Sequence, residues 1–147
     1  MTDRIRANPS ARAIAGATAA CGLLVLGLAA WMTPDQEGHG THTQIGLPEC
    51  GWAQRLDAPC MTCGMTTSFS HAADGALVES FLTQPFGMLL AVATSAVCWV
   101  GIYIALTGSM LGARLVTLVN PRTLIFAGVL ALAGWGYKLV TWQGAGG

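Results

Sequence analysis

Three apolar stretches in this chain are each long enough to cross a lipid bilayer, and they constrain its fold more than any other feature. They cover residues 13–32, 86–106 and 123–142, and the first two contain no charged residue. A membrane-spanning helix needs about 20 predominantly apolar residues. We therefore expect an all-α membrane protein with three transmembrane helices.

The third stretch contains a single charged residue, Lys138, close to its end. A lysine at the middle of a bilayer costs about 2.5–3.5 kcal/mol on the insertion scale. Near the end of a span, the long side chain can instead carry its ammonium to the lipid headgroups. We expect Lys138 to do so.

The composition agrees with a membrane protein and argues against a nucleic-acid partner. Hydrophobic residues make up 53% of the chain and charged residues only 10%, whereas a soluble domain usually has about 25% charged residues. The formal net charge is zero and no basic block is present. The lipid bilayer is therefore the expected environment of the chain.

The arginines predict the orientation of the chain in a bacterial inner membrane. They precede the first span or lie between the second and third, at Arg4, Arg6, Arg12, Arg114 and Arg122. Residues 33–85 carry Arg55 alone against six carboxylates, Asp35, Glu37, Glu49, Asp57, Asp74 and Glu79. Short basic segments stay in the cytoplasm. The N-terminus should therefore be cytoplasmic, and the 33–85 loop and the C-terminus should be outside.

The first apolar stretch could also be a cleavable signal peptide. Its apolar run of about 20 residues is longer than the 7–15 of a signal-peptide core, so an uncleaved anchor is the preferred interpretation. Cys21 follows a stretch that faintly resembles a lipoprotein cleavage box, but the residues after it are apolar where a lipoprotein has a polar tether.

These spans divide the chain into successive segments. Residues 1–12 form the cytoplasmic N-terminal segment, 33–85 the outer loop, 107–122 a cytoplasmic connection with a brief surface helix, and 143–147 the tail. Within the outer loop, residues 64–73 and 76–83 have apolar residues at helical spacing, which predicts two short interfacial helices. Residues 33–48 should be irregular because they are rich in Gly, Thr, Pro and acidic residues.

The outer loop contains three of the five cysteines, Cys50, Cys60 and Cys63. The other two, Cys21 and Cys98, lie within spans and are expected to be small apolar packing residues. Cys63 directly precedes the predicted helix at 64–73. A helix N-terminus stabilises a thiolate through its dipole and free backbone N–H groups, so we expect a stabilised thiolate at Cys63.

Four separated elements of the loop, taken together, resemble a family of small bacterial membrane proteins known as domain of unknown function 2752. Its members show a Cys-Pro pair, a Cys-Pro-x-Cys-Gly-Leu/Met-Thr-Arg motif, a Gly-Asp or similar turn and an Asn-Pro before a hydrophobic span. The matching elements are Cys50-Gly51-Trp52, Pro59-Cys60-Met61-Thr62-Cys63-Gly64-Met65-Thr66, Asp74-Gly75 and Gln84-Pro85. The resemblance covers about residues 50–106 and implies a membrane protein with a cysteine-bearing loop, without an activity.

This chain departs from the family pattern at three positions. Gly51 and Met61 stand where the family has prolines, and Thr67 stands where it has an arginine. The missing arginine removes a positive charge that could have stabilised a thiolate or bound a lipid phosphate.

The leading interpretation of the loop cysteines is structural. A disulfide from Cys50 to Cys60 or Cys63 would hold the loop over the spans, with Trp52 packed beneath it. Closing a loop of about 10–15 residues is worth about 3 kcal/mol on the chain-entropy estimate. The protein would then be an accessory or structural subunit, associated with other membrane subunits or with copies of itself, and not an enzyme.

The second interpretation is a metal site. Cys50, Cys60 and Cys63 would supply three thiolates and His71 a fourth ligand, with His39 or His42 as alternatives to His71. Zinc favours this ligand set, and the methionines beside the cysteines would suit copper(I). A covalent c-type haem is excluded because Gly64 stands where the attachment motif needs histidine.

The third interpretation is thiol–disulfide exchange by Cys60 and Cys63, whose two-residue spacing suits a cycling pair. Neither a quinone site nor a thioredoxin-like pattern accompanies them in the sequence. No catalytic residue is assigned, since the chain has no phosphate-binding glycine loop, nucleophile elbow or zinc-protease helix.

Overall fold

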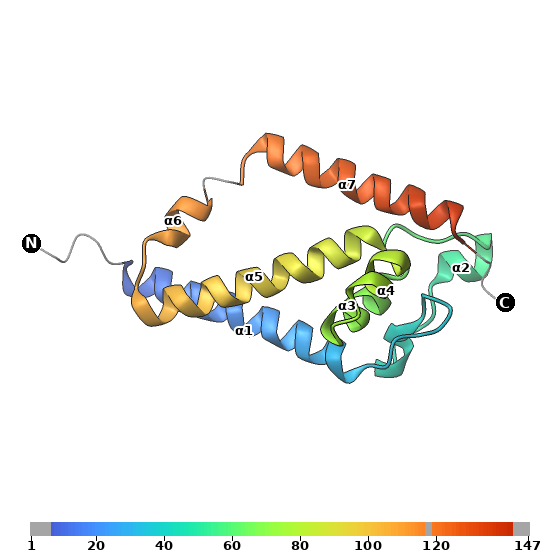
Figure 1. Ribbon diagram of the computed structural model, residues 1–147, viewed down its shortest axis with the longest axis horizontal. Helices are drawn as coiled ribbons and strands as arrows, with labels where there is room; N and C mark the ends of the chain where they lie inside the picture. The colour runs from blue at the N-terminus through green and yellow to red at the C-terminus, as the bar shows by residue number, and fades with distance from the viewer. Residues whose placement is uncertain (1–6, 117–118, 143–147) are drawn as a thin grey trace, which may run out of the picture.

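In the computed structural model, which describes residues 7–116 and 119–142, the protein is all-helical, and the described residues contain no strand. Three helices are long and apolar enough to span a membrane: α1 (Pro9–Trp31), α5 (Pro85–Thr107) and α7 (Pro121–Val140). This confirms the predicted fold class. In Figure 1, the loop between α1 and α5 gathers at one end of the molecule, close to the end of α7.

Each long helix begins at a proline in its first turn. Proline suits this position because its missing N–H has no partner within the helix and its φ is already helical. The side chain of Asn8 caps α1 by accepting from the Ala11 amide at 2.8 Å, and Asn120 caps α7 in the same way. The helix starts are therefore encoded locally.

Small residues bring α1 and α5 into close contact. A Cβ on Gly101 of α5 would lie 2.8 Å from the Ala15 carbonyl oxygen and 3.0 Å from the Ala19 Cβ. A Cβ on Gly22 of α1 would lie 2.5 Å from the Sγ of Cys98, which is buried. Small residues allow helix backbones to approach closely in lipid, and Cys98 packs at this contact as expected.

Arg12 ties the beginning of α1 to the end of α5. Its Nη2 and Nε donate to the Ala105 carbonyl oxygen at 2.7 and 3.0 Å. The last carbonyls of a helix have no partner within the helix, so the guanidinium caps α5.

The short helix α6 (Leu111–Val116) lies in the segment where a brief helix was expected. Residues 1–6 with Arg4 and Arg6, the side chain of Arg114, and the tail 143–147 lie outside the described part of the chain. The orientation in the membrane, which depends on these charges, stays a prediction.

The α1–α5 loop folds into four short helices. They are the 3₁₀ helix η2 (Thr41–Ile45), α2 (Gly51–Leu56), α3 (Met65–Ala73) and α4 (Leu77–Thr83). The helices predicted at 64–73 and 76–83 are confirmed as α3 and α4, whereas α2 was not predicted. Phe69 of α3 is buried against Ala29 of α1 and Ala91 of α5, so this cluster attaches the loop to the spans.

A buried network of hydroxyl groups holds α3 against α4 and the start of α5. The Ser68 hydroxyl donates to the Ser80 carbonyl oxygen at 2.9 Å, and the Ser80 hydroxyl donates to the Ser68 carbonyl oxygen at 2.7 Å. The Ser70 hydroxyl donates to the Met32 carbonyl oxygen at the end of α1. Buried polar groups are stable only when they are hydrogen-bonded in this way.

Candidate thiol site

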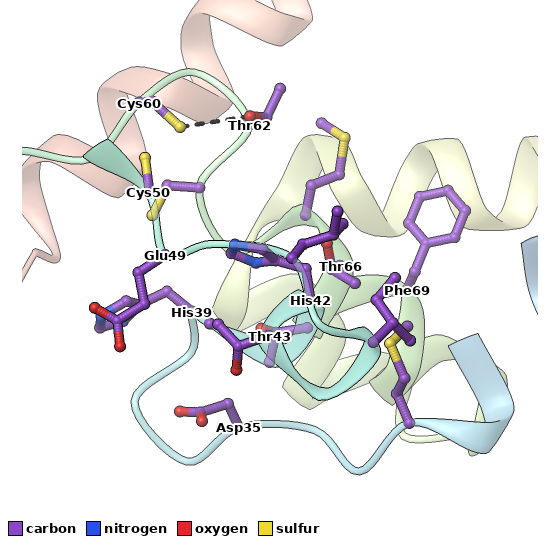
Figure 2. A pocket seen from close by; sticks show the side chains of 18 of the residues that line it. Asp35, His39, His42, Thr43, Glu49, Cys50, Cys60, Thr62, Thr66 and Phe69 are labelled. Atoms are coloured by element: carbon purple, nitrogen blue, oxygen red, sulfur yellow. Dashed lines mark hydrogen bonds between the residues drawn. The ribbon is translucent and has the colours of Figure 1, made fainter. Parts of the chain in front are cut away.

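Cys50 and Cys60 approach each other to 3.4 Å without a bond between them. Cys50 lies directly before α2, and Cys60 lies in the turn that precedes α3; their side chains are near one another in Figure 2. All five cysteines lie within the described residues and none is in a disulfide. Of the pairings open at the sequence level, the geometry therefore favours Cys50 with Cys60.

The backbone at the start of α2 lowers the pKa of the Cys50 thiol. The amide of Ala53 is the main cause that lowers the pKa of Cys50 below its ordinary 9.0, and the Cys60 thiol and the Trp52 amide act in the same direction. Partial burial opposes them. Hydrogen bonds from a helix N-terminus stabilise a thiolate, so Cys50 is suited to be the attacking thiol.

The expectation of a stabilised thiolate at Cys63 is wrong. Cys63 is only 7% exposed, and burial raises its pKa to about 11, with a smaller contribution from the neighbouring Cys60. The positive charge of Lys138 acts in the opposite direction but does not offset the burial. Desolvation disfavours the charged form of a thiol, so Cys63 stays a protonated, unreactive thiol.

Trp52, expected beneath a disulfide, is 53% exposed. It lies at the start of the six-residue helix α2 and does not line the cavity that the three loop cysteines line. The predicted packing of Trp52 under the loop is therefore wrong.

A cavity of about 720 Å³ lies next to the thiol pair. All three loop cysteines line it together with His42 and Thr66, and the labelled side chains in Figure 2 surround it. Its other wall is apolar and consists of Val25, Leu28, Met65, Phe69 and Leu90. The cavity thus joins the thiols to the apolar faces of α1 and α5.

Lys138 does not extend to the lipid headgroups as expected. Its ammonium is buried under the loop and donates to the carbonyl oxygens of Gly38 at 3.0 Å and Thr83 at 3.4 Å. Because the loop folds back over the end of α7, these carbonyls take the place of the headgroups.

Two further side chains of α7 hold the loop. The Trp135 indole donates to the carbonyl oxygen of Pro59, directly before Cys60, at 3.0 Å. The Tyr137 hydroxyl donates to the Leu82 carbonyl oxygen at 2.8 Å. The third span therefore positions the cysteine turn.

Gly64 allows the close contact between the cysteine turn, residues 37–40 and Lys138. Its φ is +81°, and a Cβ there would lie 2.7 Å from the Gly38 carbonyl oxygen and 3.2 Å from the Lys138 Nζ. Only glycine adopts this backbone conformation without strain and leaves this space empty.

The comparison with protein families concerns this cysteine-bearing segment. Residues 50–99 match DUF2752, a family described as a protein of unknown function. The resemblance predicted from the motifs is confirmed over these residues. Comparisons with curated proteins and with solved structures give no match.

The DUF2752 segment supplies all three loop cysteines and part of the cavity wall, and other parts of the site come from outside it. Lys138, Trp135, Gly38 and His42 lie beyond residues 50–99. The site therefore depends on the first and third spans and on the first part of the loop, which the family match does not include.

Thr67 is the residue at which the resemblance leads us to expect an arginine, and the structure places it in the interior. Thr67 is fully buried, and its hydroxyl lies 2.8 Å from that of Thr41 in η2. The Thr41 hydroxyl also accepts from the Asp35 amide at 3.0 Å. Thr67 thus fastens the irregular first part of the loop to α3.

The structure does not bring His71 to the cysteines of the DUF2752 segment. His71 lines a second cavity of about 670 Å³ together with Glu79 and Lys138, and it is absent from the lining of the thiol cavity. His42 lines the thiol cavity, where its Nε2 lies 3.1 Å from the Pro48 carbonyl oxygen. In the described part of the chain, no group of three or more His, Cys, Asp or Glu residues has the geometry to hold a metal ion.

Two features of the site were not predicted from the sequence. The short helix α2 carries too few residues for a periodic pattern, although Asp57, with φ of +45°, marks its end. The apolar wall of the cavity consists of residues whose sequence pattern indicates only contact with the membrane. Lys138, as the single charge of its span, was the signal that could have indicated the contact with the loop.

Proposed function

We propose that this protein is an accessory or structural membrane protein whose outer loop is locked over the spans by a reversible Cys50–Cys60 disulfide. The observation that carries this proposal is the 3.4 Å approach of the two side chains. An S–S bond is about 2.0 Å long, so the two side chains must come closer by about 1.4 Å for the bond to form. The bond would close the segment that contains α2 and hold it beside the cavity.

The bond forms when the two thiols lose two electrons and two protons to an oxidant. The Ala53 amide lowers the pKa of Cys50, which favours its thiolate, and thiolates are the reactive form. Cys63 remains a free thiol in this scheme. An oxidising compartment outside the inner membrane, where disulfides persist, fits the orientation predicted from the arginines.

The test is oxidation of the purified, reduced protein with diamide, followed by mapping of the cross-linked peptides by mass spectrometry. We expect a Cys50–Cys60 bond in the wild type and in Cys63→Ser, and none in Cys60→Ser. Cys98→Ser is the matched control within a span, and it should oxidise like the wild type. A bond between Cys50 and Cys63 in the wild type would overturn the proposed pairing.

A second candidate function is thiol–disulfide exchange with a partner, which the lowered pKa of Cys50 favours. The pair would then be Cys50 and Cys60, in place of the predicted Cys60 and Cys63. A catalytic pair equilibrates within the range of the glutathione and disulfide-isomerase couples, whereas a structural disulfide has a potential below about −300 mV. Equilibration with glutathione buffers, read by alkylation, distinguishes the two.

The zinc or copper hypothesis for Cys50, Cys60 and Cys63 with His71 remains a prediction, and the separation of His71 from the thiols argues against that ligand set. Metal analysis of protein purified without chelators tests it. Protection of the three thiols from maleimide that disappears on chelation would support the metal site. The identity of other membrane subunits, or self-association, can be tested by cross-linking in the same preparation.

A further inference from the structure

The thiol cavity connects two chemically different surroundings. One end contains Cys50 and Cys60. The other contains Val25 and Leu28 of α1 and Leu90 of α5, which are partly exposed side chains on helices able to span a membrane. The acidic side chains of Asp35, Glu37 and Glu49 also line the cavity, so it borders both charged and apolar surroundings.

The size and lining of the cavity suit a small amphipathic molecule. Its volume of about 720 Å³ falls within the roughly 300–1,000 Å³ of typical small-molecule sites. The lining also contains Thr66, whose hydroxyl can donate a hydrogen bond to a carbonyl oxygen. The apolar end offers only hydrocarbon contacts, which suit a lipid tail.

We propose that this cavity binds a lipid-soluble quinone, which oxidises Cys50 and Cys60 to a disulfide. The inference rests on the proposed function, since it names the oxidant of the same thiol pair. The ring lies at the thiol end and the tail lies between Val25, Leu28 and Leu90. The Cys50 and Cys60 S–H bonds break, the S–S bond forms, and the quinone takes both electrons and both protons to become the hydroquinone.

A membrane lipid would also fit the apolar end of the cavity, but it cannot accept electrons. The quinone accounts for both ends of the cavity at once, because its tail matches the apolar wall and its ring is a two-electron oxidant for a dithiol. The lipid alternative is therefore an outcome that the experiment must separate.

The experiment uses the reduced full-length protein in lipid nanodiscs and a decyl-tailed benzoquinone whose ring carbons are all substituted, so that thiols cannot add to the ring. Hydroquinone formation is followed by absorbance, and the Cys50–Cys60 bond is followed by mass spectrometry. The key variant is Leu90→Trp, which fills the cavity. Its matched control is Leu89→Trp, on the neighbouring residue of α5, which is similarly exposed and lies outside the cavity lining.

We expect one hydroquinone for each Cys50–Cys60 bond in the wild type and in Leu89→Trp. Leu90→Trp should slow this reaction about tenfold or more at low quinone concentration, as a tenfold weaker affinity predicts. Diamide, which is water-soluble and does not need the cavity, should oxidise all three proteins alike.

The two proposals fail in different ways. If diamide forms the Cys50–Cys60 bond but the quinone oxidises the wild type no faster than Leu90→Trp, the quinone site is wrong and the disulfide stands. If the quinone never reacts in nanodiscs although diamide forms the bond, the same conclusion holds and the cavity is a lipid site. If neither oxidant joins Cys50 to Cys60, the proposed function itself is overturned.

Discussion

The ammonium of Lys138 lies 3.0 Å from the carbonyl oxygen of Gly38, a residue 100 positions earlier in the chain. The same ammonium reaches the Thr83 carbonyl oxygen, so it contacts both the beginning and the end of the α1–α5 loop. The third span thereby holds the cysteine loop although the two are far apart in sequence. A hydrogen bond to a charged group is worth about 1.5–3 kcal/mol, enough to control local opening of the loop.

The first prediction concerns this contact. Lys138→Met should release the loop and increase trypsin cleavage at Arg55, which is exposed and is the single trypsin site in residues 33–85. Loss of about 1.4 kcal/mol would raise the cleaved fraction about tenfold when opening is fast relative to cleavage. Leu139→Met, on the next and more exposed residue, is the control and should cleave like the wild type. Equal cleavage of the two variants would show that Lys138 does not hold the loop.

The second prediction separates backbone strain from steric contact at Gly64. Gly64 and Gly75 both have φ of +81°, but a Cβ on Gly64 would meet the Gly38 carbonyl oxygen, whereas a Cβ on Gly75 has nothing within 4 Å. A left-handed conformation costs a residue with a Cβ about 1–2 kcal/mol. Gly75→Ala should therefore lower the free energy of unfolding by about that amount, and Gly64→Ala by more. Thermal unfolding in detergent measures both, and equal losses would contradict the close contact at Gly64.

The third prediction is the pH dependence of alkylation. A thiol reacts as its thiolate, so reaction of Cys50 with iodoacetamide should rise through a midpoint below 9.0. Reaction of Cys63, whose pKa is raised to about 11, should remain slow at neutral pH and increase only as the pH rises through that value. Residue-resolved mass spectrometry gives both curves. In denatured protein the two midpoints should merge at the value of an ordinary thiol; separate midpoints there would show that the fold is not the cause.

The fourth prediction tests the buried hydroxyl pair of Thr41 and Thr67. Thr67→Val keeps the shape of the side chain and removes its hydroxyl, which leaves the buried Thr41 hydroxyl with one partner fewer. We expect a loss of about 1–3 kcal/mol in the free energy of unfolding, or a fall in Tm of about 2–4 °C per kcal/mol for a chain of this length. Thr66→Val, on the neighbouring and half-buried residue, is the control. A similar Tm for both variants would mean that the pair contributes little.

The short helices of the loop show which elements can be predicted from local sequence patterns and which cannot. Apolar spacing at 64–73 and 76–83 predicted α3 and α4 because each segment presents its own buried face. The helix α2 has six residues, too few for a period to be visible, and its absence from the prediction led to the wrong position for Trp52. The prediction of an acidic thiol at Cys63 was wrong for a different reason. Its proximity to a helix start can be seen in the local sequence, but the burial of its thiol depends on the packing around it.

The sequence by itself determined the three long helices, the two principal loop helices and the segment that matches DUF2752. Length, lack of charge and motif spacing are properties of contiguous residues, so they can be read without coordinates. Only the tertiary structure decided that Cys50 faces Cys60, that Lys138 is buried under the loop, and that α1 and α5 supply an apolar wall to the thiol cavity. Each of these depends on residues that are distant in the chain and meet only because the loop folds back over the ends of the helices.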